Sequence, residues 1–143
     1  IELELDNQKA AKNWFEQAIR SPGPRSQKSE WYRQLGKLQA EAGDLEPAER
    51  SFSYALRYDP NNAYAWASFA YFKARYRNNR AEAESKIEQA LSIKPEDATL
   101  IEIKGDIYHL FSESDEAVNW WEKALELGVP TQRIQQKLSG DHD

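Results

Sequence analysis

The sequence predicts an all-α protein built from antiparallel helical hairpins that repeat along the chain. Three observations support this fold class: a recurring triplet of side chains, a nearly constant interval between its copies, and turn-forming residues between the helical segments. Each triplet has a small, a large and a small residue at spacings of four and three. The four copies are Ala11-Phe15-Ala18, Ala48-Phe52-Ala55, Ala83-Ile87-Ala90 and Ala117-Trp121-Ala124.

The spacing within each triplet predicts a packing seam on one helix of each hairpin. Residues three and four positions apart share a helical face, where two alanines let a neighbouring helix approach and the larger side chain fills the space between them. The first alanines stand at positions 11, 48, 83 and 117, so successive copies are 37, 35 and 34 residues apart. We therefore expect these segments to be the second helices of successive hairpins.

The first helices are predicted upstream of the last three triplets. Each has apolar residues around a Gly or Ala, in the sets Tyr32-Leu35-Gly36, Trp66-Phe69-Ala70 and Ile101-Gly105-Tyr108. Gly36 and Gly105 precede the first alanine of their triplets by 12 residues, whereas Ala70 precedes Ala83 by 13. This difference predicts one extra residue in the turn of the middle hairpin.

Turn-forming residues lie between the expected helices. Gly43-Asp44, Asn78-Asn79 and Ser112 to Ser114 favour sharp reversals within the three hairpins. Pro60 and Pro95 are expected to end the second helices of the first two hairpins, because proline cannot continue a helix.

Three segments resemble tetratricopeptide repeats: Trp31 to Pro60, Ala63 to Pro95 and Ala98 to Gly128. The resemblance is closest in GDIYHLFSESDEAVNWWEKALELG, and the intervals are near the 34-residue period of that family. It implies a right-handed superhelix, or solenoid, with three full repeats over residues 29–62, 63–97 and 98–130. The departures from the family pattern are local and lie at Gln39, Lys73, Ala70 and Val129-Pro130.

The amino-terminal end is expected to be a partial repeat, over residues 1–28. Ala10 to Ile19 is typical of a second helix whose first helix is missing or is formed irregularly by IELELDN. The segment SPGPRSQ is expected to be a longer loop than the other joints. We also expect the parent protein to continue upstream.

The carboxy-terminal residues 131–143 are expected to form a capping helix and a tail. Pro130-Thr131 can begin a short helix, and Ile134 and Leu138 then share one face of it. This face is expected to cover the last hydrophobic surface of the repeats.

Length and composition indicate a single domain and exclude several classes of function. The chain has 143 residues, of which 40% are hydrophobic and 30% charged, and no apolar run approaches the roughly 18 residues that cross a membrane. Its net charge of −5 disfavours nucleic-acid binding, which depends on positive charge. It contains no Cys, which excludes disulfides and cysteine zinc sites but fits a reducing or an oxidising compartment. Protein partners are favoured.

The sequence has no residue pattern of an enzyme, a cofactor site or a metal site. His109, on an expected helix, and His142, in a polar tail, have no catalytic or ligand partner at motif spacing. The tail Asp141-His142-Asp143 could bind a metal weakly, but a solvated end is the better interpretation. We therefore predict a protein that is not an enzyme and that needs no cofactor or metal.

Packing and solvation explain the aromatic and basic residues. The rings expected in the core are Phe15, Phe52, Trp66, Phe69 and Trp121. Trp120 points about 100° away from Trp121 and should contact the capping helix or be partly exposed. The basic residues near the middle turn, Lys73, Arg75, Arg77 and Arg80, are interpreted as a solvated helix end.

The resemblance places a partner-binding groove on the first helices, which in this family line the concave side of the superhelix. It selects Arg33, Gln34, Lys37, Tyr64, Ser68, Tyr71, Arg75, Thr99, Glu102, Ile103, Asp106 and His109. Charge along these residues runs from basic through aromatic to acidic, which suits a partner segment with an acidic end, an apolar middle and a basic end. The competing interpretation is that they are only solvated helix faces.

We therefore predict an adaptor or scaffold that binds a protein or peptide in this groove. Clamping of the acidic tails of heat-shock chaperones is disfavoured. The Lys, Asn, Asn, Lys and Arg of that clamp would fall on Arg33, Lys37, Ser68, Thr99 and Ile103, and none of them matches. Two alternatives stay open: a structural module that self-assembles or packs against other domains of the parent, and a subunit of c-type cytochrome assembly that binds an apo-protein segment, which the chain resembles weakly.

Overall fold

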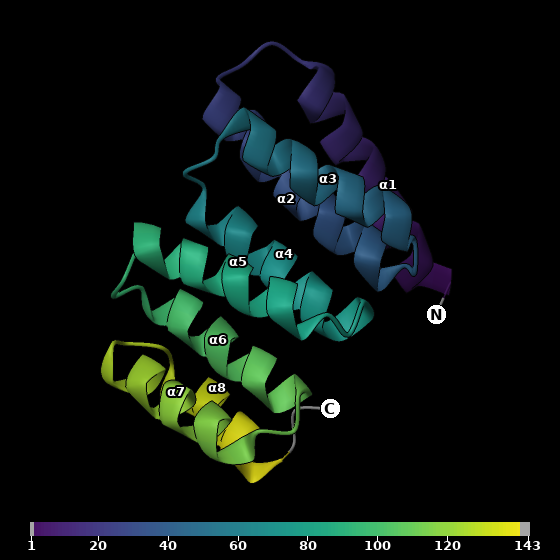
Figure 1. The fold of residues 1–143 in the computed structure, drawn as a ribbon. Coiled ribbons are helices and arrows are strands. Elements are labelled where there is room, and N and C mark those ends of the chain that lie inside the picture. The colour runs from purple at the N-terminus through teal and green to yellow at the C-terminus, as the bar shows by residue number, and fades with distance from the viewer. Residues whose placement is uncertain (1, 141–143) are drawn as a thin grey trace. The chain divides into compact units, whose positions relative to one another are not determined.

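The computed structural model describes residues 2–140, and every regular element in that range is an α-helix. The all-α prediction is therefore confirmed for these residues (Figure 1). The chain divides inside one helix into two compact units, Ile1–Phe69 and Ala70–Asp143. The helices of the described range are α1 (Glu2–Arg20), α2 (Arg25–Glu41), α3 (Leu45–Tyr58), α4 (Ala63–Tyr76), α5 (Arg80–Ile93), α6 (Ala98–Leu110), α7 (Ser114–Glu126) and α8 (Thr131–Ser139).

Turns of three residues connect α2 to α3, α4 to α5 and α6 to α7. The middle residue of each turn has a positive φ angle, which is 87° at Gly43, 49° at Asn78 and 62° at Ser112. This left-handed conformation ends a helix sharply, and Gly and Asn adopt it at low cost. The turns predicted at Gly43-Asp44 and Asn78-Asn79 are confirmed, whereas the third spans residues 111–113 and so begins one residue earlier than predicted.

The extra residue of the middle hairpin lies in α4 and not in the turn, which corrects the prediction. In the first hairpin, the backbone N–H of Asp44 donates to the carbonyl of Gln39, five residues earlier, over 2.9 Å. In the middle hairpin, the N–H of Asn79 donates to the carbonyl of Lys73, six residues earlier, over 2.9 Å. The added residue therefore widens the last turn of α4, and the three-residue connection is kept.

The amino-terminal segment also differs from the prediction. α1 is one helix of 19 residues, so residues 2–7 of IELELDN continue the helix through Ala10 to Ile19 and do not form a separate element. The loop that follows spans only residues 21–24, the same length as the connections at 59–62, 94–97 and 127–130. It is short because Pro24, with a φ of −62°, directly precedes the first turn of α2, which already includes Ser26 and Gln27.

The triplets of α3, α5 and α7 form the expected packing seams, with every residue at most 3% exposed, whereas the residues of the α1 triplet are only half buried. In the first unit, Phe52 is 1% exposed and its ring stacks on that of Phe69 with centroids 5.4 Å apart. A Cβ added to Gly36 would lie 2.9 Å from the Phe52 ring, and one added to Gly105 would lie 2.5 Å from the Trp121 ring in the second unit. The large residue of a triplet therefore fills the space that glycine leaves on the facing helix.

The capping helix is confirmed as α8, but only half of its predicted apolar face is buried. Ile134 is fully buried and packs in a cluster with Ile101, Trp121 and Val129 of the second unit. Leu138 is 43% exposed, so it does not cover the core as predicted.

Two of the rings expected in the core are less buried than predicted, and Trp120 is intermediate between burial and full exposure. Phe15 and Trp66 are only half buried, and the Trp66 Nε1 donates a hydrogen bond to the carbonyl of Pro60 over 2.8 Å. Trp120 is also half buried, and the Lys104 Nζ lies 4.0 Å from its ring centroid. Gln39, which stands where the family often has an aromatic residue, is buried and accepts a hydrogen bond from Ser51 over 2.6 Å.

Candidate functional site

On the first helix of each of the three hairpins, the same two positions beside the small Gly or Ala residue stay outside the core. These positions lie two residues before and one residue after Gly36, Ala70 or Gly105, and residues three apart share a helical face. All six side chains lie outside the core, with Lys37 exposed and the other five half buried. The pairs are Gln34 and Lys37 on α2, Ser68 and Tyr71 on α4, and Ile103 and Asp106 on α6.

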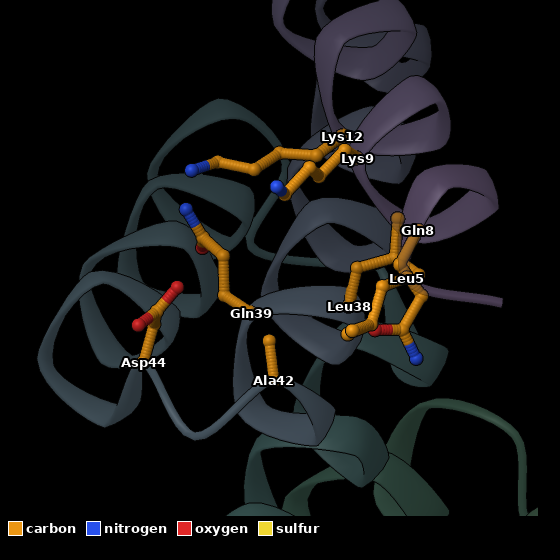
Figure 2. Close-up of a pocket in the computed structure, with 8 residues that line it drawn as sticks. All are labelled: Leu5, Gln8, Lys9, Lys12, Leu38, Gln39, Ala42 and Asp44. Carbon is orange, nitrogen blue, oxygen red and sulfur yellow. The ribbon is translucent and has the colours of Figure 1, made fainter. Parts of the chain in front are cut away.

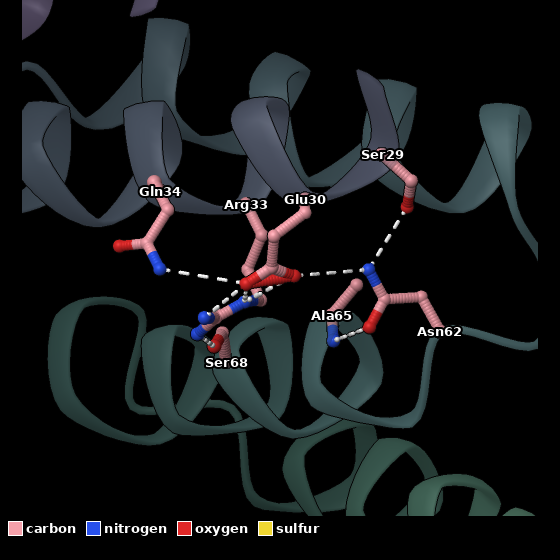
Figure 3. A network of polar contacts seen from close by, with 7 residues as sticks. All are labelled: Ser29, Glu30, Arg33, Gln34, Asn62, Ala65 and Ser68. Carbon is pink, nitrogen blue, oxygen red and sulfur yellow. Dashed lines mark hydrogen bonds and ion pairs between the residues drawn. The ribbon is translucent and has the colours of Figure 1, made fainter. Parts of the chain in front are cut away.

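In the first unit, Arg33 of α2 is held by a carboxylate of its own helix. Its guanidinium pairs with Glu30, where Nε donates to both carboxylate oxygens over 2.9 and 3.1 Å. Its Nη1 also donates to the Ser68 hydroxyl over 3.2 Å, and Gln34 donates to the Glu30 carboxylate over 3.4 Å (Figure 3). Two predicted groove residues, Arg33 and Ser68, are thus brought together, but the positive charge of Arg33 is largely neutralised within the unit.

Asn62 connects α2 to the start of α4 in the same network. Its side-chain amide donates to the Ser29 hydroxyl over 3.0 Å and to Glu30 over 3.5 Å, while its Oδ1 accepts from the N–H of Ala65 over 3.1 Å (Figure 3). Ser29 is fully buried and donates in turn to the carbonyl of Ala55 over 2.6 Å. Asn62 therefore caps α4 and fixes its first turn against α2. Tyr64, another predicted groove residue, is half buried in this first turn.

The surroundings of Glu30 lower the pKa of its carboxyl group. Partial burial raises the pKa, but hydrogen bonds from Arg33, Asn62 and Gln34 and the charge of Arg33 outweigh it, so the pKa lies below its ordinary value of 4.5. A carboxyl group with a depressed pKa stabilises the folded state above its unfolded pKa, and this stabilisation is lost as pH falls through the folded pKa.

We therefore expect Glu30→Gln to reduce the acid sensitivity of the chain. The difference in unfolding free energy between the unmodified chain and the variant should be constant near neutral pH and should shrink once the pH falls below about 4.5, because both proteins then carry a neutral side chain. Urea unfolding at a series of pH values measures this difference. The control is Glu46→Gln, at an exposed position in the first turn of α3. If the difference in unfolding free energy between the unmodified chain and Glu46→Gln depends on pH as strongly as the difference for Glu30→Gln, the role of Glu30 is contradicted.

In the second unit, Tyr71 and Arg75 of α4 form a surface pair. The Arg75 Nη1 donates to the Tyr71 hydroxyl over 3.1 Å, and its guanidinium lies 5.5 Å from the ring centroid of Tyr76. The hydrogen bond to the Tyr71 hydroxyl raises the pKa of Arg75. A guanidinium is in any case cationic at physiological pH, so this exposed side chain carries a positive charge. The pair presents an aromatic ring beside a permanent positive charge.

The acidic residues predicted for the groove are paired with α8. Glu102 is 4% exposed, and it accepts hydrogen bonds from the Arg133 guanidinium over 2.6 and 2.9 Å. The Lys137 Nζ lies 2.7 Å from a carboxylate oxygen of Glu102 and 2.7 Å from one of Asp106. The expectation of an open acidic surface is therefore wrong at Glu102 and weakened at Asp106, because α8 covers and neutralises both carboxylates.

The remaining predicted residues of α6 differ in accessibility. Thr99 is exposed, whereas Ile103 and His109 are half buried, and the His109 ring centroid lies 5.5 Å from that of Trp121. The Trp121 Nε1 donates to Asp106 over 3.0 Å. Burial raises the pKa of Asp106 above its ordinary value of 3.8, even though Lys137 and Trp121 favour its charged form.

The sequence did not lead us to predict the ion-pair partners of Arg33, Glu102 and Asp106. These partners are Glu30, Arg133 and Lys137. One signal in the sequence points to the last two. Glu102 and Asp106 are four residues apart, as are Arg133 and Lys137, so each pair forms one charged face of a helix. Two short helices with opposite charges at the same spacing are complementary, and charge patterning of this kind can be recognised from residue spacing alone.

A pocket of about 190 Å³ lies on another face of α2, against α1. Its lining residues are Leu5, Gln8, Lys9, Lys12, Leu38, Gln39, Ala42 and Asp44 (Figure 2). Sites for drug-sized ligands usually measure about 300 to 1,000 Å³. This pocket is too small for such a ligand, and none of the predicted groove residues lines it.

Among the side chains of residues 3–140, no group of three His, Asp or Glu residues is arranged to hold a metal ion. The tail Asp141-His142-Asp143, which was expected to be a solvated end, lies outside the described residues. In the same part of the chain, no helix combines the length and the apolar character needed to cross a membrane. No protein-family model and no curated protein matches the sequence.

Proposed function

We propose that the chain is a tetratricopeptide-type adaptor, a right-handed superhelix of hairpins that binds a segment of another protein on its first helices. The proposal is based on one observation. In α2, α4 and α6 the same two positions beside each seam stay outside the core, although their side chains differ from repeat to repeat. A core position repeats its residue type for packing, whereas varied side chains at a repeated surface position suit recognition of a partner.

The accessible side chains favour a partner segment that is acidic and carries an apolar or aromatic residue. Lys37 and Arg75 are exposed cations, and Tyr71 supplies a ring next to Arg75. The predicted acidic end, Glu102 and Asp106, is paired with α8, so it offers little attraction to a basic partner. Rings contribute contact area at a low entropic cost, and exposed charges steer the encounter.

Tyr71→Ala is expected to weaken partner binding about thirtyfold, roughly 2 kcal/mol, as loss of a central aromatic anchor does. The probe is a set of peptides selected from a random phage-display library against the immobilised chain, and the affinity of each peptide is measured by fluorescence anisotropy. Tyr71→Phe keeps the ring and loses only the hydroxyl that accepts from Arg75, so it should retain most of the affinity.

Glu122→Ala, at an exposed position on α7, is the matched surface control and should leave the affinity unchanged. Circular dichroism melting should show that Tyr71→Ala remains folded, because Tyr71 is only half buried. If Tyr71→Ala binds like the unmodified chain while Glu122→Ala does not, the partner binds to the second helices and the proposal is wrong.

A further inference from the structure

The pocket between α1 and α2 is apolar on one side. Leu5 of α1, Leu38 of α2 and Ala42, which follows α2, form this side (Figure 2). The pocket measures about 190 Å³, and an apolar cavity of about 150 Å³ is large enough to hold benzene. The space therefore suits one small organic molecule with an apolar group.

The other side of the pocket carries charged and polar groups. Figure 2 shows the side-chain nitrogens of Lys9, Lys12 and Gln39 gathered there. The Asp44 carboxylate lines the same side, and its backbone N–H donates to the carbonyl of Gln39 over 2.9 Å. Lys9, Lys12 and Asp44 form no ion pair with any residue of the described range, so their charges are available to a ligand.

Gln39 gives this polar side a fixed hydrogen-bond donor. Its side chain is 8% exposed, and its Oε1 accepts from the Ser51 hydroxyl over 2.6 Å, which sets the orientation of the amide. The Nε2 of the same amide donates to no other residue that the structure describes, and it points toward the two lysines in Figure 2. A ligand oxygen at this place would bind a donor that is already ordered, which lowers the entropic cost of binding.

The charges on the polar side distinguish between classes of ligand. Two ammonium groups and an amide N–H together suit a carboxylate, which accepts several charge-assisted hydrogen bonds. A ligand with only a carboxylate would be repelled by Asp44, and a ligand with only an amine would be repelled by the two lysines. An α-amino acid carries a carboxylate and an ammonium group on one carbon atom, so it can pair with both kinds of charge.

We propose that the pocket binds a free aliphatic α-amino acid of about the size of leucine. Lys9, Lys12 and the Gln39 Nε2 bind its carboxylate. Asp44 binds its ammonium group, and its side chain lies on the apolar side of the pocket. The site is separate from the binding face on the first helices, because none of the predicted groove residues lines the pocket. The two proposals can therefore fail independently.

A titration of the whole chain with leucine, followed by the methyl ¹H–¹³C shifts of the protein, tests the proposal. The methyl signals of Leu5, Leu38 and Ala42 should shift and saturate with a dissociation constant of about 1 mM or tighter. Glycine lacks the apolar side chain and should bind at least about tenfold more weakly. Absence of saturable shifts at these methyl groups up to about 20 mM leucine would overturn the proposal.

Two analogues of leucine test whether both charged groups of the ligand are needed. N-Acetyl-leucine lacks the ammonium group and resembles the carboxyl end of a peptide, whereas leucinamide lacks the carboxylate and resembles an amino end. Each should bind at least about tenfold more weakly than leucine. If either analogue binds as tightly as leucine, the pocket recognises the end of a peptide chain, and the assignment to a free amino acid is wrong.

Asp44→Asn tests the group that is assigned to the ammonium. The dissociation constant of leucine should rise about tenfold, whereas that of N-acetyl-leucine should not rise, because this analogue has no ammonium group. The Asp44 side chain makes no capping hydrogen bond to α3, so the variant should keep its fold. Asp6→Asn, at an exposed position of α1 outside the pocket, is the matched control and should change neither constant. An equal loss of affinity for both ligands in Asp44→Asn would contradict its role.

Lys9→Gln combined with Lys12→Gln tests the carboxylate site. This double variant should raise the dissociation constant of leucine by at least about tenfold, with circular dichroism showing that the helices are kept. Arg20→Gln removes a cation from an exposed position of α1 outside the pocket and should leave the constant unchanged. Leucine binding that is unaffected by the loss of both lysines would reject the proposed site.

Discussion

Replacing both Arg133 and Lys137 by alanine is expected to destabilise the second unit by about 3 kcal/mol. Glu102 is 4% exposed, and these two side chains of α8 supply the cations that approach its carboxylate. Removing the partners of a buried charge leaves that charge without compensation, which typically costs about 3 to 5 kcal/mol. The lower end applies because the Arg133 side chain is itself 45% exposed. Urea denaturation followed by circular dichroism measures the loss.

Further variants distinguish an uncompensated charge at Glu102 from a loss of helix propensity or of surface contacts in α8 as the cause of this destabilisation. Adding Glu102→Gln to the double variant removes the buried charge and should recover part of the stability. Gln135→Ala with Gln136→Ala changes two exposed residues of the same helix and should shift the unfolding free energy by no more than about 0.5 kcal/mol. If this pair destabilises as much as the loss of Arg133 and Lys137, the ion pairs do not hold α8.

Trp121→Ala is expected to cost about 3 to 5 kcal/mol, because it removes a buried ring and the hydrogen bond from its Nε1 to Asp106. Gly105→Ala should cost about 1 to 3 kcal/mol by overpacking, since its Cβ would lie 2.5 Å from the Trp121 ring. Without that ring, alanine at position 105 has room beside residue 121 and is a better helix former than glycine.

The double variant therefore tests the seam itself. Gly105→Ala combined with Trp121→Ala should be more stable than the sum of the two single effects implies, by at least about 1 kcal/mol. Thermal and urea unfolding of the four proteins complete the cycle. Additive effects would mean that Gly105 is not required by the Trp121 ring, which would undermine the pairing of small and large residues on facing helices.

The hairpins can be predicted from the sequence because their signals are local and repeated. Alanine spacing identifies the second helices, and Gly43, Asn78 and Ser112 identify the reversals. The position of the extra residue in the middle hairpin cannot be predicted in this way, since the sequence count from Ala70 to Ala83 does not distinguish a longer turn from a wider last helical turn. The first turn of α2 is hard to distinguish from a loop because Ser and Gln are common in both.

The candidate site is harder to predict than the fold. The repeat pattern indicates which positions avoid the seam, but it does not indicate which charges meet a partner from another helix. The prediction of an open groove at Arg33 misses its ion pair because Glu30 lies outside the family positions that select groove residues. The prediction for Glu102 fails for a similar reason, because α8, more than 25 residues later in the chain, covers it.

The measurement that tests the proposed function most directly is a titration of the ¹⁵N-labelled chain with a selected peptide, followed by backbone amide shifts. We expect the largest saturable changes at Gln34, Lys37, Ser68, Tyr71 and Arg75. Changes confined to α3, α5 and α7, with these five amides unmoved, would contradict the proposed function.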